Sequence, residues 1–278
     1  MKSFSSEALT RRRPDIFRAL GPAEPPPVID VGEKNFALIE CLKHDSWAAT
    51  AIYGGKDGQR LACKFNRCQP LPCGIPARRL GAWLASREAQ VMRDMADVAG
   101  FPRFPGDAST AGKLLDNAVA HWWIDGKPFR PDLEVSDGFF PQLSLMLSSF
   151  HATGRAYVDM NKWGNIIVGA DGSPTLLDYQ IHFRASKTPI SRWLLRQLQK
   201  GDWYYLRRHW RRCRPDQYRE LADPAWSREP VHIWLAERVG FIFRSLRIAV
   251  LRLHGVTGDP RRDEEVSCAR SAGPAVPR

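Results

Sequence analysis

A predicted hairpin in the second half of the chain constrains the fold more than any other feature of the sequence. The stretch NIIVGADGSPTLLD begins at Asn165, turns around Asp171 and Gly172, and ends at Asp178. Two apolar runs joined by an Asp-Gly turn are typical of a β-hairpin. Because a hairpin brings its two ends together, we expect Asn165 and Asp178 to lie side by side, although thirteen positions separate them.

Both ends of this hairpin carry side-chain oxygens, which are the ligands that Mg²⁺ prefers in proteins. Asn165 and Asp178 therefore predict a metal site that the phosphate oxygens of a substrate would complete. Asp159 lies just upstream, in AYVDMNKWGN, where it is placed to accept a proton from a hydroxyl group. A metal site and a base are two of the parts that phosphoryl transfer requires, because its catalysis consists mostly of positioning and charge neutralisation.

Strand-like and helix-like segments are divided unevenly along the chain. Short β-prone runs and one helical pattern, ARRLGAWLASREAQVMRDMADV, come first, and mostly helical patterns follow the hairpin as far as Leu253. The prediction is an α+β protein with a β-rich N-lobe at residues 31–123 and a reduced helical C-lobe at residues 124–258. Composition predicts a flexible tail at residues 1–30 and a disordered tail at residues 259–278.

Several motifs resemble those of one enzyme superfamily. YVDMNKWGN resembles the catalytic loop of protein kinases, H-R-D-x-x-x-x-N, and LLDYQ resembles their metal-binding D-F-G segment. The spacing of Asn165 and Asp178 also matches typical protein kinases. Upstream, RLACKF is similar to the strand that bears the phosphate-binding lysine, SREAQVMRDM to the regulatory helix, and AVAHWWIDGKPF to the hinge between the lobes, near Ile124. The resemblance covers roughly residues 35–183 and implies a protein-kinase-like bilobal fold.

The resemblance also implies a role for each candidate site residue. Lys64 would bind the α- and β-phosphates of ATP, and Glu88 would fix Lys64 in place. Asp159 would orient or deprotonate the hydroxyl group of the acceptor. Asn165 and Asp178 would bind Mg²⁺, with Mn²⁺ as the alternative ion.

Other features depart from the kinase pattern. KHDSWAAT takes the place of the glycine-rich loop and contains no glycine, although Ser46 offers a hydroxyl group to a phosphate there. The catalytic loop is one residue longer, Lys162 is the candidate for steadying the transferred phosphate, and no A-P-E segment follows. These departures favour the compact bacterial and archaeal members, namely RIO-like kinases and the Kdo and heptose kinases of the lipopolysaccharide core.

The predicted activity is ATP- and Mg²⁺-dependent transfer of the γ-phosphate to a hydroxyl group, on a protein Ser/Thr or on a lipopolysaccharide-core sugar. A catalytically weak pseudokinase, acting as a nucleotide- or membrane-surface-binding module, is the alternative. A third hypothesis is a scaffold that binds membranes or nucleic acid and in which the kinase resemblance is vestigial.

The net charge of +11 is concentrated after the hairpin. Residues 184–219 contain eleven Lys or Arg and two acids, with six Trp or Tyr interleaved. Three interpretations stay open: a surface for anionic membranes, a surface for nucleic acid, and a solvated face of core helices. We expect a cytoplasmic protein, because there is no secretory signal, no C-x-x-C pair and no apolar run of about 18 residues; the membrane interpretation would place it at the inner face of the membrane.

Overall fold

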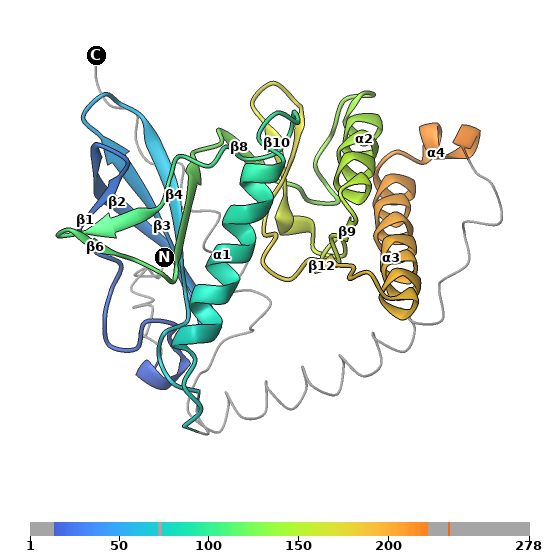
Figure 1. The fold of residues 1–278 in the computed structure, drawn as a ribbon. Helices are drawn as coiled ribbons and strands as arrows, with labels where there is room; N and C mark the ends of the chain where they lie inside the picture. Colours follow the sequence, from blue (N-terminus) through green and yellow to red (C-terminus); the bar gives the residue numbers. More distant parts are fainter. Residues whose placement is uncertain (1–13, 72–73, 222–232, 234–278) are drawn as a thin grey trace, which may run out of the picture.

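The computed structural model describes residues 14–71, 74–221 and Ile233 of the 278-residue chain. A sheet-rich N-terminal part and a helical C-terminal part lie next to each other, with helix α1 (Arg78–Asp94) between them (Figure 1). This division is the α+β arrangement of two lobes that the order of the sequence patterns predicts.

The N-terminal part is built on one antiparallel sheet with the strand order β6-β5-β1-β2-β3-β4-β7. Its strands are β1 (Val28–Val31), β2 (Lys34–His44), β3 (Ala48–Gly55), β4 (Arg60–Asn66), β5 (Ala108–Thr110), β6 (Lys113–Leu114) and β7 (Ala118–Trp122). The sheet is curled, because β5 near one end contacts β7 at the other. Strands β3 and β4 form an antiparallel hairpin around GGKDG.

Helix α1 (Arg78–Asp94) covers part of this sheet and contacts β4 and β7. Its buried positions include Ala85, Glu88, Ala89 and Met92, a spacing that places them on one helical face. Three of them are apolar and pack with Val119 of β7. The same face therefore directs Glu88 toward the sheet.

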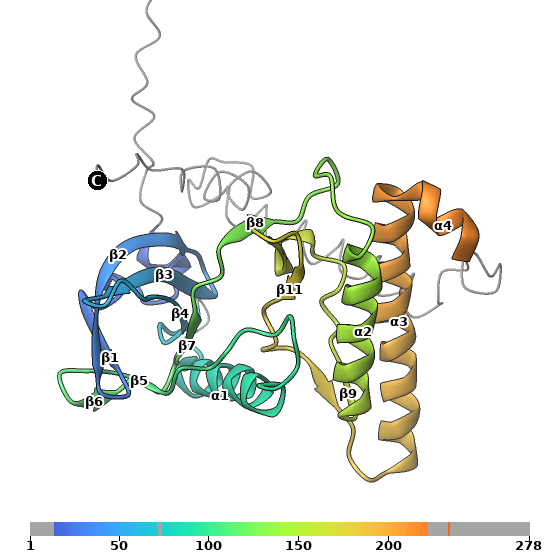
Figure 2. The same cartoon turned by 90° about the horizontal axis from the view of Figure 1, so that it is seen from above.

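The chain crosses to the second part at residues 123–125, which include Ile124. There β8 (Gly126–Pro128) joins a separate sheet with β10 (Ile166–Gly169) and β11 (Pro174–Leu176) (Figure 2). In that sheet Ile166 pairs with Leu176, so β10 and β11 form the hairpin that the sequence predicts.

Three helices and a short two-stranded sheet complete the C-terminal part. The helices are α2 (Phe139–Ala152), α3 (Pro189–Cys213) and α4 (Pro215–Leu221), and β9 (Arg155–Ala156) pairs with β12 (Phe183–Arg184). The two short 3-10 helices of the described chain are η1 (Asp15–Phe17) and η2 (Trp163–Asn165). The core is rich in fully buried aromatic side chains, among them Phe139, Phe140, Phe150, Tyr157 and Tyr179.

Residues 14–30 differ from the expected flexible tail. Phe17, Arg18 and Ala19 are buried, and Ala19 N donates a hydrogen bond to Asp45 O (2.7 Å). The Pro-rich composition suggests a linker, but proline also holds a backbone extended, and an extended segment packs readily along a sheet. The helical patterns beyond Leu221 and the predicted tail at residues 259–278 lie outside the described residues.

Candidate active site

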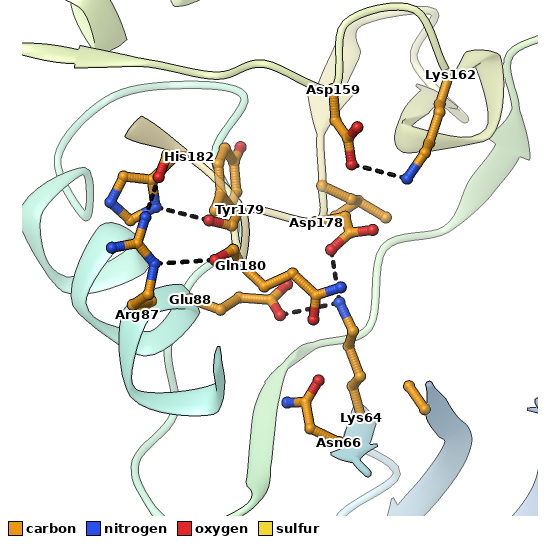
Figure 3. Close-up of polar contacts among 12 residues, drawn as sticks. Lys64, Asn66, Arg87, Glu88, Asp159, Lys162, Asp178, Tyr179, Gln180 and His182 are labelled. Atoms are coloured by element: carbon orange, nitrogen blue, oxygen red, sulfur yellow. Dashed lines mark hydrogen bonds and ion pairs between the residues drawn. The ribbon is translucent and has the colours of Figure 1, made fainter. Parts of the chain in front are cut away.

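Lys64 connects the two parts of the molecule. Its Nζ donates to Glu88 Oε2 of α1 (3.0 Å) and to Asp178 Oδ1 at the end of β11 (2.7 Å), as Figure 3 shows. The three side chains come from positions up to 114 residues apart in the sequence. The predicted pairing of Lys64 with Glu88 is present, and Asp178 is a second partner that the sequence patterns did not indicate.

The charges of these three groups depend on one another. Burial acts to lower the pKa of Lys64, but the two carboxylates outweigh it and raise the pKa well above its ordinary value. Burial raises the pKa of Glu88, and the charge of Lys64 only partly opposes this. The ammonium group thus stays positive in a largely dry environment, which strengthens its attraction for a phosphate.

Asp159 lies beyond Asp178 as seen from Lys64, in the loop between β9 and η2 (Figure 3). It is buried, and one of its oxygens accepts a hydrogen bond from Lys162 Nζ (2.8 Å). Burial raises the pKa of Asp159, and Lys162 offsets only part of this effect. A carboxylate that binds a proton more readily than usual is suited to act as a general base.

Asn165 lies beside Asp178, as the hairpin predicts. Leu177 N donates to Asn165 O (2.8 Å), which sets the two segments next to each other just beyond the paired residues Ile166 and Leu176. The Nδ2 atom of Asn165 is buried and has no hydrogen-bond partner. An amide N–H donates to oxygen atoms such as those of a phosphate, whereas the Oδ1 atom of Asn165 is the one that can bind a cation.

These two residues fit a magnesium ion only together with a substrate. Within the described part of the chain, no group of three or more His, Cys, Asp or Glu side chains is placed to hold a metal. Mg²⁺ commonly takes one or two protein oxygens and completes its shell with phosphate oxygens and water. Asn165 and Asp178 supply that number of ligands.

Asp202 of α3 holds the loop that carries Asp159. Its carboxylate accepts hydrogen bonds from Tyr157 N and Val158 N (both 2.7 Å) and contacts His151 Nε2 (2.8 Å), and the residue is only 1% exposed. Val158 has a φ of +75°, a conformation that costs energy for a β-branched residue. Asp202 thus stabilises a strained backbone immediately before Asp159.

Arg87 holds the segment that follows Asp178. From α1 its guanidinium donates to Gln180 O (3.0 Å) and to His182 O, while His182 is itself buried against Tyr179 (Figure 3). Asp178 has a φ of +61°, so this segment is strained as well. Neither Arg87 nor Asp202 was predicted. The signal for Asp202 was its position as one of two acids in a strongly basic stretch.

Ser46 does not join the cluster by a hydrogen bond. Its Oγ donates instead to Phe17 O (3.2 Å) in the N-terminal segment, and Arg67 holds its carbonyl group. The structure thus brings together Lys64, Glu88, Asp178, Asn165 and the Asp159–Lys162 pair, whereas Ser46 is engaged elsewhere.

No family model and no curated protein matches the sequence. Among solved structures, Rio2 kinase from Chaetomium thermophilum, as an ADP/Mg²⁺-phosphoaspartate complex, matches with a TM-score of 0.45 and 14% identity, over 66% of this chain and 56% of that chain. A second Rio2 kinase structure from the same organism matches with the same score and identity, over 68% and 57%. The chain thus spans little more than half the length of these chains, and at this level the likeness adds nothing on activity.

The architecture itself defines the class of fold. A curled antiparallel sheet, a helix whose glutamate pairs with a lysine of the sheet, and a hairpin that delivers an aspartate to the same lysine lie beside a helical part. The described residues have a protein-kinase-like fold, as the sequence resemblance implied.

Proposed function

We propose that this protein is a phosphotransferase that uses ATP and Mg²⁺ and phosphorylates a hydroxyl group. The observation that carries the proposal is the contact of Lys64 with both Glu88 and Asp178, across from the Asp159–Lys162 pair. Phosphoryl transfer needs positive charge at the phosphates and a base at the nucleophile, and these groups supply both.

Each residue has one role in this proposal. Lys64 binds the α- and β-phosphates and is kept in position by Glu88. Asp159 accepts the proton of the acceptor hydroxyl as the hydroxyl oxygen bonds to the γ-phosphorus and the bond from that phosphorus to the β-phosphate oxygen breaks. Lys162 lies next to Asp159 and neutralises charge on the transferred group. Mg²⁺, bound by Asn165 and Asp178 together with phosphate oxygens, would neutralise the leaving phosphate.

Two substitutions test the activity. Asp178→Asn and Lys64→Met are each expected to remove transfer of labelled phosphate from ATP while the circular dichroism spectrum stays that of the folded protein. Full turnover in either variant would overturn the assignment. Lys34→Met is the matched control, because Lys34 is exposed at the start of β2 and pairs with Asp57.

Three acceptors are candidates: a protein Ser/Thr, a lipopolysaccharide-core sugar of the Kdo or heptose type, and another small hydroxyl compound. A panel of proteins, lipopolysaccharide fragments and small alcohols, incubated with labelled ATP, distinguishes them by the product that carries the label. The extra residue in MNKWG lies between Asp159 and Asn165, so we expect it to contribute to this choice.

The second candidate is a pseudokinase that binds a nucleotide without transferring phosphate. It is favoured by the turn that replaces the glycine-rich loop, in which the Asp45 carboxylate accepts hydrogen bonds from two backbone amides. A thermal shift with ATP and Mg²⁺ in the absence of any ATP hydrolysis or transfer to the panel would favour this candidate. Turnover that is lost in Asp178→Asn would exclude it.

We further propose that the N-terminal half of α3 binds an anionic membrane surface. Ile190 and Trp193 are 79% and 59% exposed and Leu194 is exposed beside them. Exposed basic side chains surround them, and residues 184–201 contain no acid. Aliphatic side chains favour lipid over nucleic acid, because they cannot stack on bases as aromatic rings do. Within the described residues no helix has the length and apolar character to cross a membrane.

Vesicle co-sedimentation tests this surface. Binding is expected with vesicles containing phosphatidylglycerol and not with phosphatidylcholine alone. The double variant Arg192→Ala/Arg196→Ala should weaken it about tenfold or more, since each basic residue contributes about 1 kcal/mol near an anionic surface. Trp193→Ala should also weaken it, whereas Trp83→Ala, which removes an exposed tryptophan of α1, should not. Binding to oligonucleotides in place of vesicles would overturn the lipid assignment, and so would binding to neither.

A further inference from the structure

The turn between β2 and β3 occupies the position of the glycine-rich loop and is closed by its own carboxylate. Asp45 Oδ1 accepts hydrogen bonds from Trp47 N (2.7 Å) and Ala48 N (3.0 Å). Backbone amides are what a glycine-rich loop offers to phosphates. In this chain the two amides already have an anionic partner, so the turn does not offer them to a nucleotide.

The N-terminal segment keeps this turn in place. Ala19 N donates to Asp45 O (2.7 Å), Ser46 Oγ donates to Phe17 O (3.2 Å), and the Arg67 guanidinium donates to Ser46 O (2.7 Å). Contacts from two other segments thus fix residues 45 and 46. Reopening this backbone around a ligand would break these hydrogen bonds, whereas a side chain can contact a phosphate without breaking them.

Two irregularities in β2 bring one such side chain to the site. The pairing with β3 shifts between Leu38 and Glu40 and again between Cys41 and Lys43, each time by one extra residue in β2. Without these extra residues Cys41 would lie opposite Thr50, but in the structure Lys43 does. Bulges of this kind re-aim side chains and are frequent next to active sites.

Lys43 therefore shares a face of the sheet with Lys64. Thr50 of β3 pairs with Lys43 on one side and with Lys64 on the other. Residues directly opposite each other in an antiparallel ladder point to the same face. The two lysines are two strands apart, a distance of roughly 10 Å between their backbones, which a nucleotide triphosphate can span.

The ammonium group of Lys43 has a carboxylate partner in the turn that replaces the glycine-rich loop. Its Nζ forms an ion pair with Asp45 Oδ2 (2.7 Å).

We propose that Lys43 binds the nucleotide phosphates in place of the missing glycine-rich loop, and that Asp45 holds Lys43 until a phosphate displaces the carboxylate. The inference rests on the proposed function and adds a phosphate ligand to that site. It predicts effects of opposite sign at the two residues of the ion pair, because one is the ligand and the other competes with the phosphate.

Calorimetric titration of the full-length protein with ATP and Mg²⁺, and separately with adenosine, tests the inference. Lys43→Met is expected to raise the Kd for ATP about tenfold and to leave the Kd for adenosine unchanged. Asp45→Asn keeps an oxygen for the two amides and is expected to lower the Kd for ATP severalfold. Lys43→Arg should bind ATP nearly as well as the wild-type protein, and Lys34→Met is the control on the same strand.

The outcomes separate this inference from the function on which it rests. Wild-type binding of ATP with an unchanged Kd in Lys43→Met would overturn the inference and leave the proposed function intact. An equal loss of ATP and adenosine binding in Lys43→Met, or weaker ATP binding in Asp45→Asn at an unchanged Tm, would overturn it as well. If the wild-type protein bound neither ATP nor adenosine, the proposed function would fail and the inference with it.

Discussion

The loop that carries Asp159 and the end of the hairpin each place one aspartate at the candidate site, and their surroundings shift the pKa values of the two carboxylates in opposite directions. Burial raises the pKa of Asp159, and its neighbour Lys162 is half exposed and only partly compensates. Burial also acts to raise the pKa of Asp178, but the charge of Lys64, followed by those of Lys162 and Lys43, lowers it overall.

This difference assigns the roles of the two groups. Two carboxylates whose environments drive their pKa values apart are suited to different tasks in one reaction. Asp159 takes up a proton more readily and is the candidate base. Asp178 stays ionised and is the candidate metal ligand and partner of Lys64.

The largest expected effect comes from separating these roles by mutation. Asp159→Asn should lower kcat by about 10²- to 10⁴-fold, the usual contribution of a general base, and leave ATP binding with Mg²⁺ unchanged. Asp178→Asn should abolish turnover and also remove the dependence of ATP binding on Mg²⁺. Single-turnover kinetics and calorimetry measure the two quantities. Loss of Mg²⁺ dependence in Asp159→Asn, with its retention in Asp178→Asn, would reverse the assignment.

The loop that carries Asp159 is held by a buried carboxylate, Asp202, whereas the segment after Asp178 is held by the guanidinium group of Arg87. Asp202 binds two backbone amides and His151, so Asp202→Ala would leave buried donors without an acceptor. We expect it to reduce the free energy of unfolding by about 3 kcal/mol and to lower kcat, while ATP binding is less affected. Urea denaturation measures the change in the free energy of unfolding. Asp202→Asn keeps one acceptor and should lose less, and Asp132→Ala, at an exposed acid, should change stability by less than about 0.5 kcal/mol.

A smaller effect is expected from a substitution at Glu88, the partner of Lys64 on helix α1. Glu88→Gln removes the negative charge of Glu88 beside Lys64 but keeps a hydrogen-bond acceptor there. Asp178 still contacts the lysine. We expect KM for ATP to rise about tenfold, the equivalent of about 1.4 kcal/mol, with a smaller change in kcat. Ser86→Ala, at an exposed position two residues earlier on α1, is the control. An unchanged KM would mean that Asp178 alone positions Lys64.

The sequence was sufficient to predict the parts of this site that follow from local patterns. The hairpin signal around Asp171 and Gly172 correctly placed Asn165 beside Asp178. The division into a β-rich part and a helical part followed from the order of the periodic segments, and the fold class is as predicted.

The missed features depend on contacts between distant segments. Asp202 lies 44 positions from Val158, whose amide it binds, and no local pattern relates the two. The two shifts of register in β2 that bring Lys43 opposite Thr50 arise from pairing with β3, and the sequence of β2 alone does not encode them visibly. The packing of residues 14–30 on the sheet likewise depends on partners such as Asp45, which a Pro-rich composition does not indicate.

The smallest expected effect concerns stability, and it is the most direct test of the contrast between the two aspartates. The raised pKa of Asp159 means that its ionised form is disfavoured in the folded state, so the wild-type protein loses stability as pH rises through that pKa. The lowered pKa of Asp178 has the reverse effect. Its carboxylate stabilises the folded state at pH values above 3.8, the ordinary pKa, and this stability is lost as pH falls through the folded pKa.

At neutral pH, Asp159→Asn should therefore have a slightly higher Tm than the wild-type protein, and Asp178→Asn a lower one. The difference for Asp159→Asn should shrink as pH falls from the raised pKa of Asp159 toward 3.8, and the difference for Asp178→Asn only as pH falls below 3.8. Thermal denaturation across this range measures them, and shifts of the same sign at neutral pH would contradict the division of roles between the two carboxylates.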